Sequence, residues 1–403
     1  MMPFNGGRSR ATMLLPVYNR IDLDISHGKG SFIYSRSGKR YLDFATGVAV
    51  NCLGHCHPAL VEAIRLQSEK IWHISNLFVI EEAEALAKKL TGATFADYVF
   101  FCNSGTEAVE CLIKMVRKYH DSVGNPHKYR IVSFTGAFHG RTLAALWAGK
   151  RDPMMQEGFG PPVDGFDNVP FNDIDAVKAA ITPDTGAILV ETVQGDGGVR
   201  PCDPDYLRAL RQLADERDLL LCLDEVQCGA GRTGKLYAYE HYGVVPDVMA
   251  GAKGMGGGIP LGACLATKKA AQGMTTGSHG TTYGGNPLAT AVGSVVFDHI
   301  SRPEFLENVA KTGDYLREGL LRVAEEFPKD VLEVRGMGCL LGIKTPYNVR
   351  EACARLAERG LLSAPAAENV VRLLPPLNLS RDEVDLALSI VRGLFADNPF
   401  TRA

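Results

Sequence analysis

The sequence lacks the features that would direct it to a membrane or to nucleic acid. No apolar run reaches the ~18 residues that a membrane span needs. The formal net charge is −3, which gives no indication of a basic surface for nucleic acid. Near the N-terminus, the apolar run Met13–Leu15 is too short for the core of a signal peptide. We therefore expect a cytoplasmic protein without a nucleic-acid or membrane partner.

The sequence also lacks paired cysteines. None of the ten cysteines forms a CxxC pair, which predicts reduced and mostly buried thiols. The densest metal-like cluster is Cys52, His55, Cys56 and His57, but no second ligand pair follows at zinc-finger spacing. Because His57 precedes Pro58, this cluster is typical of the start of a helix. We expect no metal site.

What is present is a regular alternation of strand-like and helix-like segments from about residue 45 to 290. This alternation predicts βαβ units and an α/β fold, with a mainly parallel sheet covered by helices on both faces. The predicted strands are Tyr98–Cys102, Arg130–Thr135, Ala187–Val190 and Leu219–Leu223, and the predicted helices are Ala83–Leu90, Ala108–Tyr119, Asp173–Ala180 and Asp205–Arg217.

The pattern changes after Pro287, and 403 residues are enough for more than one core. Long helical segments and short strands there predict a smaller α+β domain. We divide the chain into an N-terminal segment (1–45) that packs with the small domain, a large domain (46–290) and the small domain (291–403). The predicted small-domain elements are helices 288–300, 303–327, 349–358 and 381–396 and strands 331–334, 340–344 and 370–374.

Two separated residues indicate a cofactor. The apolar run Leu219–Leu223 ends at Asp224, and Lys253 follows 29 residues later among small residues. In open α/β sheets, ligands bind where the carboxyl ends of strands meet. An acid for a pyridinium nitrogen and a lysine for a Schiff base are what pyridoxal phosphate requires.

Two other strands end in segments that suit the same ligand. Ser104 and Glu107 have capping-box spacing, so a helix begins there, and its N-terminus is suited to bind phosphate next to Gly105 and Thr106. Phe138 and Arg141 follow another strand, where a ring can stack and a guanidinium can bind a carboxylate. Taken singly, these segments also fit an ordinary capped helix, a core phenylalanine and a surface arginine.

The run Gly229–Lys235 matches most of a nucleotide-binding Walker A motif. Leu236 stands where that motif has the Ser or Thr that binds magnesium. We therefore interpret the run as a glycine-rich loop and expect no ATP site.

Together these segments resemble the class III aminotransferases of the ornithine/acetylornithine type, which are dimeric pyridoxal-phosphate enzymes of fold type I. The resemblance extends over nearly the whole chain. It is carried by the segments 41–44, 53–58, 73–76, 103–108, 136–142, 194–199, 224–234, 252–258, 279–288 and 372–377.

The resemblance implies roles for individual residues. Lys253 would hold the cofactor and move the substrate proton, and Asp224 would pair with the pyridine nitrogen. Gln227 would contact the ring hydroxyl, and Phe138 would stack on the ring. The full cofactor-binding set would be Ser104, Gly105, Thr106, Phe138, Asp224, Glu225, Val226, Gln227, Lys253 and, from the second subunit of a homodimer, Thr282.

The implied reaction has two half-reactions. N2-acetyl-L-ornithine gives its terminal amine to the cofactor, and 2-oxoglutarate then collects it and leaves as glutamate, a step of arginine biosynthesis. Arg141 would bind the α-carboxylate of acetylornithine, and Arg372 that of glutamate. The substrate-binding set would be Arg141, Glu191, Asp196, Thr281 and Arg372.

Other functions remain open at this stage. The amino donor could instead be ornithine, succinylornithine, succinyldiaminopimelate or 4-aminobutyrate. An aminomutase or racemase on the same scaffold would not need 2-oxoglutarate. A non-catalytic or nucleotide-binding protein is disfavoured by Lys253 and by the incomplete Walker motif.

Three positions depart from the family pattern. The family usually has Glu where this chain has Asp196, and this acid shields the glutamate-binding arginine in related ornithine enzymes. Asp196 is one methylene shorter, so we expect weaker shielding of Arg372 and less discrimination between the half-reactions. Thr281 replaces a serine and keeps its hydroxyl, while Val109 replaces an asparagine.

Overall fold

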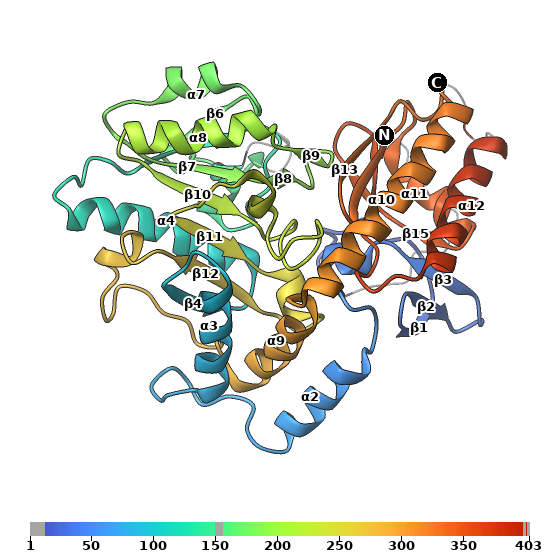
Figure 1. Ribbon diagram of the computed structural model, residues 1–403, viewed down its shortest axis with the longest axis horizontal. Coiled ribbons are helices and arrows are strands. Elements are labelled where there is room, and N and C mark those ends of the chain that lie inside the picture. The colour runs from blue at the N-terminus through green and yellow to red at the C-terminus, as the bar shows by residue number, and fades with distance from the viewer. Residues whose placement is uncertain (1–12, 150–155, 398–399, 401–403) are drawn as a thin grey trace.

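The computed structural model describes residues 13–149, 156–397 and 400 (Figure 1). Its largest sheet has seven strands in the order β4-β12-β11-β10-β7-β5-β6. All neighbouring pairs are parallel except those that β12 makes with β11 and β4. This confirms the predicted mainly parallel sheet. The strands are β4 (Tyr98–Cys102), β5 (Arg130–Phe134), β6 (Phe166–Val169), β7 (Thr185–Glu191), β10 (Leu220–Asp224), β11 (Val248–Gly251) and β12 (Gly262–Ala266).

Helices cover both faces of this sheet. Leu220 and Cys222 of β10 belong to a buried cluster with α4 (Gly105–Ser122) and α5 (Leu143–Ala148). The alternate residues Leu221 and Leu223 pack into a second cluster on the opposite face. That cluster includes residues of α2 (Pro58–Ser68), α3 (Glu81–Ala93), α7 (Ile174–Ala180), α8 (Pro204–Glu216) and α9 (Pro287–Ile300).

The C-terminal part of the chain forms an antiparallel sheet in the order β13-β14-β17-β16. A separate buried cluster joins this sheet to the helices that follow α9. The strands are β13 (Glu333–Met337), β14 (Leu340–Lys344), β16 (Ala364–Ala366) and β17 (Val370–Leu373), and the helices are α10 (Pro303–Glu326), α11 (Val349–Glu358) and α12 (Arg381–Asp397).

The N-terminal strands lie beside this C-terminal part (Figure 1). Strands β1 (Ile25–Lys29), β2 (Phe32–Ser35) and β3 (Arg40–Asp43) form a meander, and β3 pairs in parallel with β15 (Leu361–Leu362). Helix α9 crosses the predicted boundary at residue 290 and packs against α2 and α3. The domain limits at residues 45 and 290 therefore remain predictions.

Three strands of the large sheet were not predicted from the sequence. β11 and β12 are built largely from alanine and glycine, which have low strand propensity, and β6 carries two polar residues. Their place in the sheet depends on tertiary pairing. The remaining short elements are α1 (Thr46–Ala49), β8 (Val193–Gln194), β9 (Arg200–Pro201), η1 (Ala238–Tyr242), η2 (Lys253–Gly256) and η3 (Ala270–Gly273).

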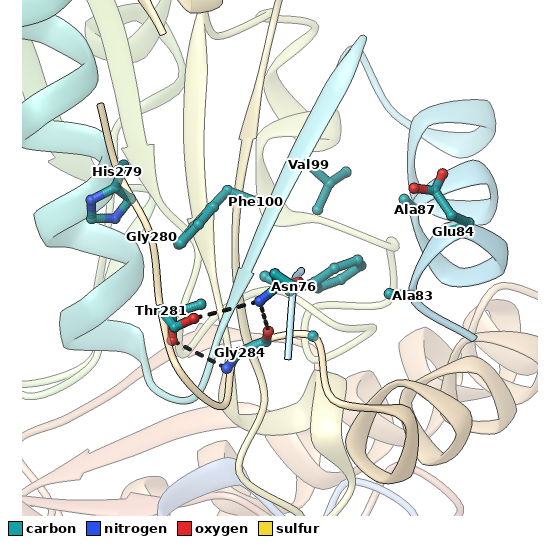
Figure 2. Close-up of a pocket in the computed structure, with 12 residues that line it drawn as sticks. Asn76, Ala83, Glu84, Ala87, Val99, Phe100, His279, Gly280, Thr281 and Gly284 are labelled. Atoms are coloured by element: carbon teal, nitrogen blue, oxygen red, sulfur yellow. Dashed lines mark hydrogen bonds between the residues drawn. The ribbon is translucent and has the colours of Figure 1, made fainter. Parts of the chain in front are cut away.

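A cavity of about 320 Å³ lies at the β4 edge of the large sheet (Figure 2). It is lined by residues of α3 and β4 and by the loop that contains His279 and Thr281. The Asn76 side chain closes one end by donating a hydrogen bond to the Gly284 carbonyl, with the two atoms 3.1 Å apart.

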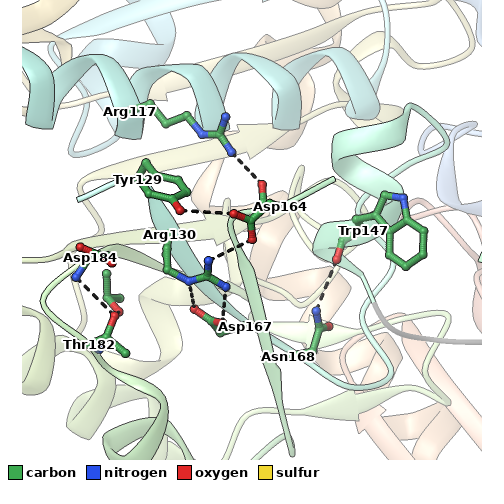
Figure 3. A network of polar contacts seen from close by, with 10 residues as sticks. Arg117, Tyr129, Arg130, Trp147, Asp164, Asp167, Asn168, Thr182 and Asp184 are labelled. Atoms are coloured by element: carbon green, nitrogen blue, oxygen red, sulfur yellow. Dashed lines mark hydrogen bonds and ion pairs between the residues drawn. The ribbon is translucent and has the colours of Figure 1, made fainter. Parts of the chain in front are cut away.

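Charged side chains hold the opposite edge strand, β6, against β5 (Figure 3). Arg130 of β5 donates two hydrogen bonds to Asp167 of β6, at 2.9 and 2.7 Å, and one to Asp164 at 3.0 Å. Paired hydrogen bonds of this kind fix the direction of both groups. Among the described residues, no helix is both long and apolar enough to cross a membrane.

Candidate active site

Two buried carboxyl groups end neighbouring strands of the large sheet. Asp224 ends β10 and Glu191 ends β7, and their Cα atoms are partners in the parallel pairing. The two residues are 4% and 5% exposed. Burial, together with the nearby charge of Asp224, raises the pKa of Glu191 well above its usual value. The neutral form of Glu191 is therefore favoured beside Asp224.

His139 orients the Asp224 carboxylate. Its Nδ1 lies 2.8 Å from Asp224 Oδ2, and both side chains are buried. The backbone N–H of Val226 donates to the other oxygen at 3.0 Å. An ionised carboxylate only accepts hydrogen bonds, so Nδ1 donates the proton of this bond. This role was not predicted from the sequence. The only sequence signal for it is that His139 lies between Phe138 and Arg141, after β5.

Lys253 begins the short helix η2 that follows β11, with a left-handed φ of +51°. Burial lowers the pKa of Lys253, and so does the charge of Arg372, while Asp196, Asp224 and Glu191 oppose the shift. These four predicted site residues are the ones whose charges influence the amine. A lowered pKa increases the neutral fraction of the amine, which is the form that reacts or accepts a proton.

The N-terminus of α4 has the predicted capping geometry. Ser104 Oγ donates to Glu107 Oε2 at 2.9 Å, and the Glu107 N–H donates back to Ser104 Oγ at 3.4 Å. The N–H groups of Gly105 and Thr106 lie in the first turn, where no carbonyl of the helix can accept from them. A Cβ on Gly105 would lie 2.7 Å from Val226 Cγ1. This turn therefore offers free donors at a position that only glycine fits.

The segment after β5 packs against this turn. The Thr106 hydroxyl accepts a hydrogen bond from the Arg141 N–H at 3.3 Å. The guanidinium of Arg141 lies 5.1 Å from the centre of the Phe138 ring, and the Phe138 N–H donates to Glu191 at 3.1 Å. Arg141 is exposed, so its charge is available to a carboxylate from outside.

Arg372 enters the site from β17 of the C-terminal sheet and is 2% exposed. Its Nη1 donates to Gln227 Oε1 at 2.7 Å, and its Nη2 lies 3.3 Å from Asp196 Oδ1. The shorter Asp196 thus contacts Arg372, but through one long contact. Weaker shielding of Arg372 remains a prediction.

The carboxylate of Glu225 is already bound within the fold. It accepts hydrogen bonds from the Thr192 hydroxyl at 2.7 Å and from the N–H groups of Ala238 and Tyr239, both at 2.9 Å. These partners fix the start of η1. The Glu225 carboxylate therefore supports the loop after β10, and a contact of this residue with the cofactor remains a prediction.

Thr281 and Thr282 lie in the loop that lines the cavity of Figure 2. The Thr281 hydroxyl accepts from the Gly284 N–H at 3.1 Å, and Thr282 is exposed. Within the described part of the chain, no hydrogen bond joins either residue to Lys253 or Asp224. This separation is compatible with the prediction that Thr282 acts in a second subunit. Val109, the third departure from the family pattern, is fully buried on the apolar face of α4.

Side chains from other parts of the fold pack closely against the glycines of the loop 229–235. A Cβ on Gly234 would lie 2.8 Å from Ala310 Cβ, and one on Gly231 would lie 3.1 Å from Leu377. The buried Arg232 donates to the Cys339 carbonyl at 3.3 Å. In residues 13–149, 156–397 and 400, no group of three or more His, Cys, Asp or Glu side chains is arranged to hold a metal.

The sequence is similar to known proteins of one family over nearly its whole length. The model of the aminotransferase class-III family matches residues 16–394. The chain is 54% identical to an acetylornithine aminotransferase of Agrobacterium fabrum over 386 residues, which is 96% of each chain. It is 52% identical to the acetylornithine aminotransferase of Mesorhizobium japonicum over 380 residues, covering 94% of this chain and 95% of that one.

Similar solved structures are aminotransferases that are named for two different substrates. An ornithine aminotransferase from Toxoplasma gondii superposes with a TM-score of 0.92 at 29% identity, covering 96% of this chain and 93% of that chain. An N-acetylornithine aminotransferase from Stenotrophomonas maltophilia has a TM-score of 0.83 at 37% identity, covering 94% and 97%. Fold similarity therefore does not distinguish the two donors.

The fold and the buried Asp224–Lys253 pair define a pyridoxal-phosphate enzyme of fold type I. The chain belongs to the class III aminotransferases. Its residues fit the cofactor: the first turn of α4 offers free donors to a phosphate, and Asp224 offers a carboxylate to a ring nitrogen. A Cβ on Gly140 would lie 2.1 Å from Thr106 Oγ1, so this cradle also requires glycine.

Glu225 predicts a measurable pH dependence. Burial raises its pKa from 4.5 to about 7, although four hydrogen bonds oppose the shift. Between these values the folded protein holds a proton that the unfolded chain has released, so the free energy of unfolding falls as the pH rises. Over this pH range, we expect the free energy of unfolding of Glu225→Gln to fall by about 3 kcal/mol less than that of the unmodified protein. Urea unfolding of both proteins at pH 4.5 and at about pH 7 measures this difference in the free energy of unfolding.

The exposed Glu304→Gln provides the matched control and should leave the pH dependence unchanged. If Glu225→Gln lost stability with pH as steeply as the unmodified protein, the assigned pKa of Glu225 would be wrong.

Proposed function

We propose that this protein transfers the terminal amine of N2-acetyl-L-ornithine to 2-oxoglutarate, giving N-acetyl-L-glutamate 5-semialdehyde and L-glutamate, in arginine biosynthesis. The observation that carries the proposal is the pair of arginines, one exposed at Arg141 and one shielded at Arg372. A transaminase that accepts two unlike amino donors needs two carboxylate sites used at different times. The names of the relatives that are 54% and 52% identical support the choice of donor.

The chemistry depends on a few side chains. When bound, pyridoxal phosphate supplies an electron sink for the carbon that loses its proton. Asp224 would pair with the protonated ring nitrogen, and His139 keeps its carboxylate in place. Lys253 would hold the cofactor and would act as general base and acid toward the substrate proton, which its lowered pKa favours.

The two carboxylate sites then assign the substrates. The exposed Arg141 binds the α-carboxylate of acetylornithine, so the terminal amine of this extended molecule lies at Lys253. Glutamate reacts through its α-amine, and its α-carboxylate binds Arg372 once the contacts with Gln227 and Asp196 open. The acetyl group removes the positive charge of the donor's α-amine, so acetylornithine brings less cation repulsion to Arg141 than ornithine does.

A panel of amino donors with 2-oxoglutarate as acceptor tests this assignment. We expect kcat/KM for acetylornithine to exceed that for ornithine by at least about tenfold, which is a difference of about 1.4 kcal/mol. 4-Aminobutyrate should be poor because its carboxylate lies one carbon closer to the reacting amine, so it cannot reach Arg141 and Lys253 in the same way. The panel also includes succinylornithine and succinyldiaminopimelate.

Equal or better turnover of ornithine would contradict the assignment. Reaction without 2-oxoglutarate would favour an aminomutase or a racemase instead.

We also propose that the active unit is a homodimer with its sites at the interface. Trp72, Leu77, Phe78 and Val79 expose large apolar side chains, and Leu77 is 86% exposed. The ring of His73, in the same segment, lies 5.2 Å from that of Tyr283, next to Thr282. An exposed apolar patch of this kind is typical of a protein interface. Thr282 would then donate its hydroxyl to the cofactor phosphate in the neighbouring subunit.

Mixed dimers test the shared site. We expect Thr282→Val to weaken cofactor affinity about tenfold through loss of one hydrogen bond to a charged group. In a dimer of one Lys253→Ala subunit and one Thr282→Val subunit, one site keeps both native residues. It should bind the cofactor with unmodified affinity at half stoichiometry. Weakened affinity in the mixed dimer, or a monomer in sedimentation, would contradict the proposal.

A further inference from the structure

Arg372 is a buried cation whose contacts differ in length. Its Nη1 donates to Gln227 Oε1 at 2.7 Å, while its Nη2 lies 3.3 Å from both Asp196 Oδ1 and the Pro365 carbonyl. Hydrogen bonds between an ionised donor and its acceptor are about 2.7–2.9 Å long. The amide of Gln227, and not the carboxylate of Asp196, therefore makes the close contact with this guanidinium.

The same amide also contacts Asp196. Gln227 Nε2 donates to Asp196 Oδ2 at 3.4 Å, while the other Asp196 oxygen faces Arg372. The amide oxygen must face the guanidinium and the amide nitrogen must face the carboxylate, since the reverse orientation would bring two donors together. Gln227 thus links the cation to the acid.

The loop that carries Asp196 packs closely against Gln227. A Cβ on Gly195 would lie 1.9 Å from Gln227 Oε1, so the loop backbone already touches the amide. The Asp196 carbonyl is held by the Ala367 N–H at 2.9 Å. The backbone of this loop therefore has no room to move toward Gln227.

We propose that Gln227 determines specificity by shielding Arg372, jointly with Asp196, until a dicarboxylate substrate displaces its amide oxygen. This inference rests on the proposed function, in which Arg372 binds the α-carboxylate of glutamate and 2-oxoglutarate. A carboxylate that binds the guanidinium end-on, through Nη1 and Nη2, needs the nitrogen that Gln227 occupies, whereas side-on binding through Nη2 and the unpartnered Nε would leave the Gln227 contact in place. Binding through Arg141 does not disturb this contact.

Binding of glutarate to the holoenzyme tests the proposal, measured by titration calorimetry. Glutarate is a five-carbon dicarboxylate without an amine or a keto group, so it binds without reacting. We expect Gln227→Leu to tighten glutarate binding about tenfold, because the ligand no longer displaces a hydrogen bond to a charged group. Gln227→Glu should weaken binding, since its carboxylate would pair with Arg372 more strongly.

Gln194→Leu is the matched control. Gln194 is a buried glutamine at the end of β8, two residues before Asp196, and its Nε2 donates to the Thr135 carbonyl at 3.1 Å. It should leave glutarate affinity within about twofold of the unmodified enzyme, a change of less than 0.5 kcal/mol by the usual conversion (about 1.4 kcal/mol per tenfold). The cofactor absorbance of each variant shows whether the site is intact.

The ratio of affinities between Gln227→Leu and the unmodified enzyme should be the same at about 0.1 M and about 1 M salt, because the amide is neutral. Unchanged glutarate affinity in Gln227→Leu, or equal tightening in Gln194→Leu, would overturn the proposal. If Gln227→Leu fails to fold, Gln227→Glu decides the question. Tighter glutarate binding by Gln227→Glu would also overturn the proposal. If the enzyme prefers ornithine as amino donor and Gln227→Leu still binds glutarate more tightly, only the assignment of acetylornithine as the donor is refuted.

Discussion

The rest of the active site depends on the buried carboxylate of Asp224. It lies at the carboxyl end of β10, next to Glu191, in a position where an unsupported charge would be costly. Hydrogen bonds from His139 and from the Val226 N–H stabilise the charge. With this acid held in place, a ring nitrogen, Lys253 and the first turn of α4 have defined positions around one ligand.

The second constraint is that one pocket must accept two different amino donors. Arg372 is too buried to be left without partners, yet it must become available to the smaller substrate. Gln227 and Asp196 meet both demands because they satisfy the guanidinium without a close ion pair. A tighter, two-point pair with a longer acid would open less readily. In the proposed mechanism, the contacts in the resting protein would set the balance between the two half-reactions.

The sequence predicts much of this arrangement, because the signals are local. Asp224 follows an apolar run, and Ser104 has its capping partner three residues away. The contacts between distant segments were not predictable in the same way: His139 meets Asp224 across 85 residues, and Arg372 meets Gln227 across 145. The resemblance to the family implied that Glu225 binds the cofactor, and this remains a prediction. Successive side chains of an extended chain point in opposite directions, so the Glu225 side chain points away from that of Asp224. The Glu225 carboxylate binds the start of η1.

Trapping the cofactor tests the central claim most directly. Borohydride reduces the bond between pyridoxal phosphate and an enzyme amine, and peptide mass spectrometry then locates the modified lysine. The account predicts a single phosphopyridoxyl group on Lys253, and its loss in Lys253→Ala. Modification at a different lysine, or no modification of the protein, would contradict the assignment of the Asp224–Lys253 pair as the catalytic centre.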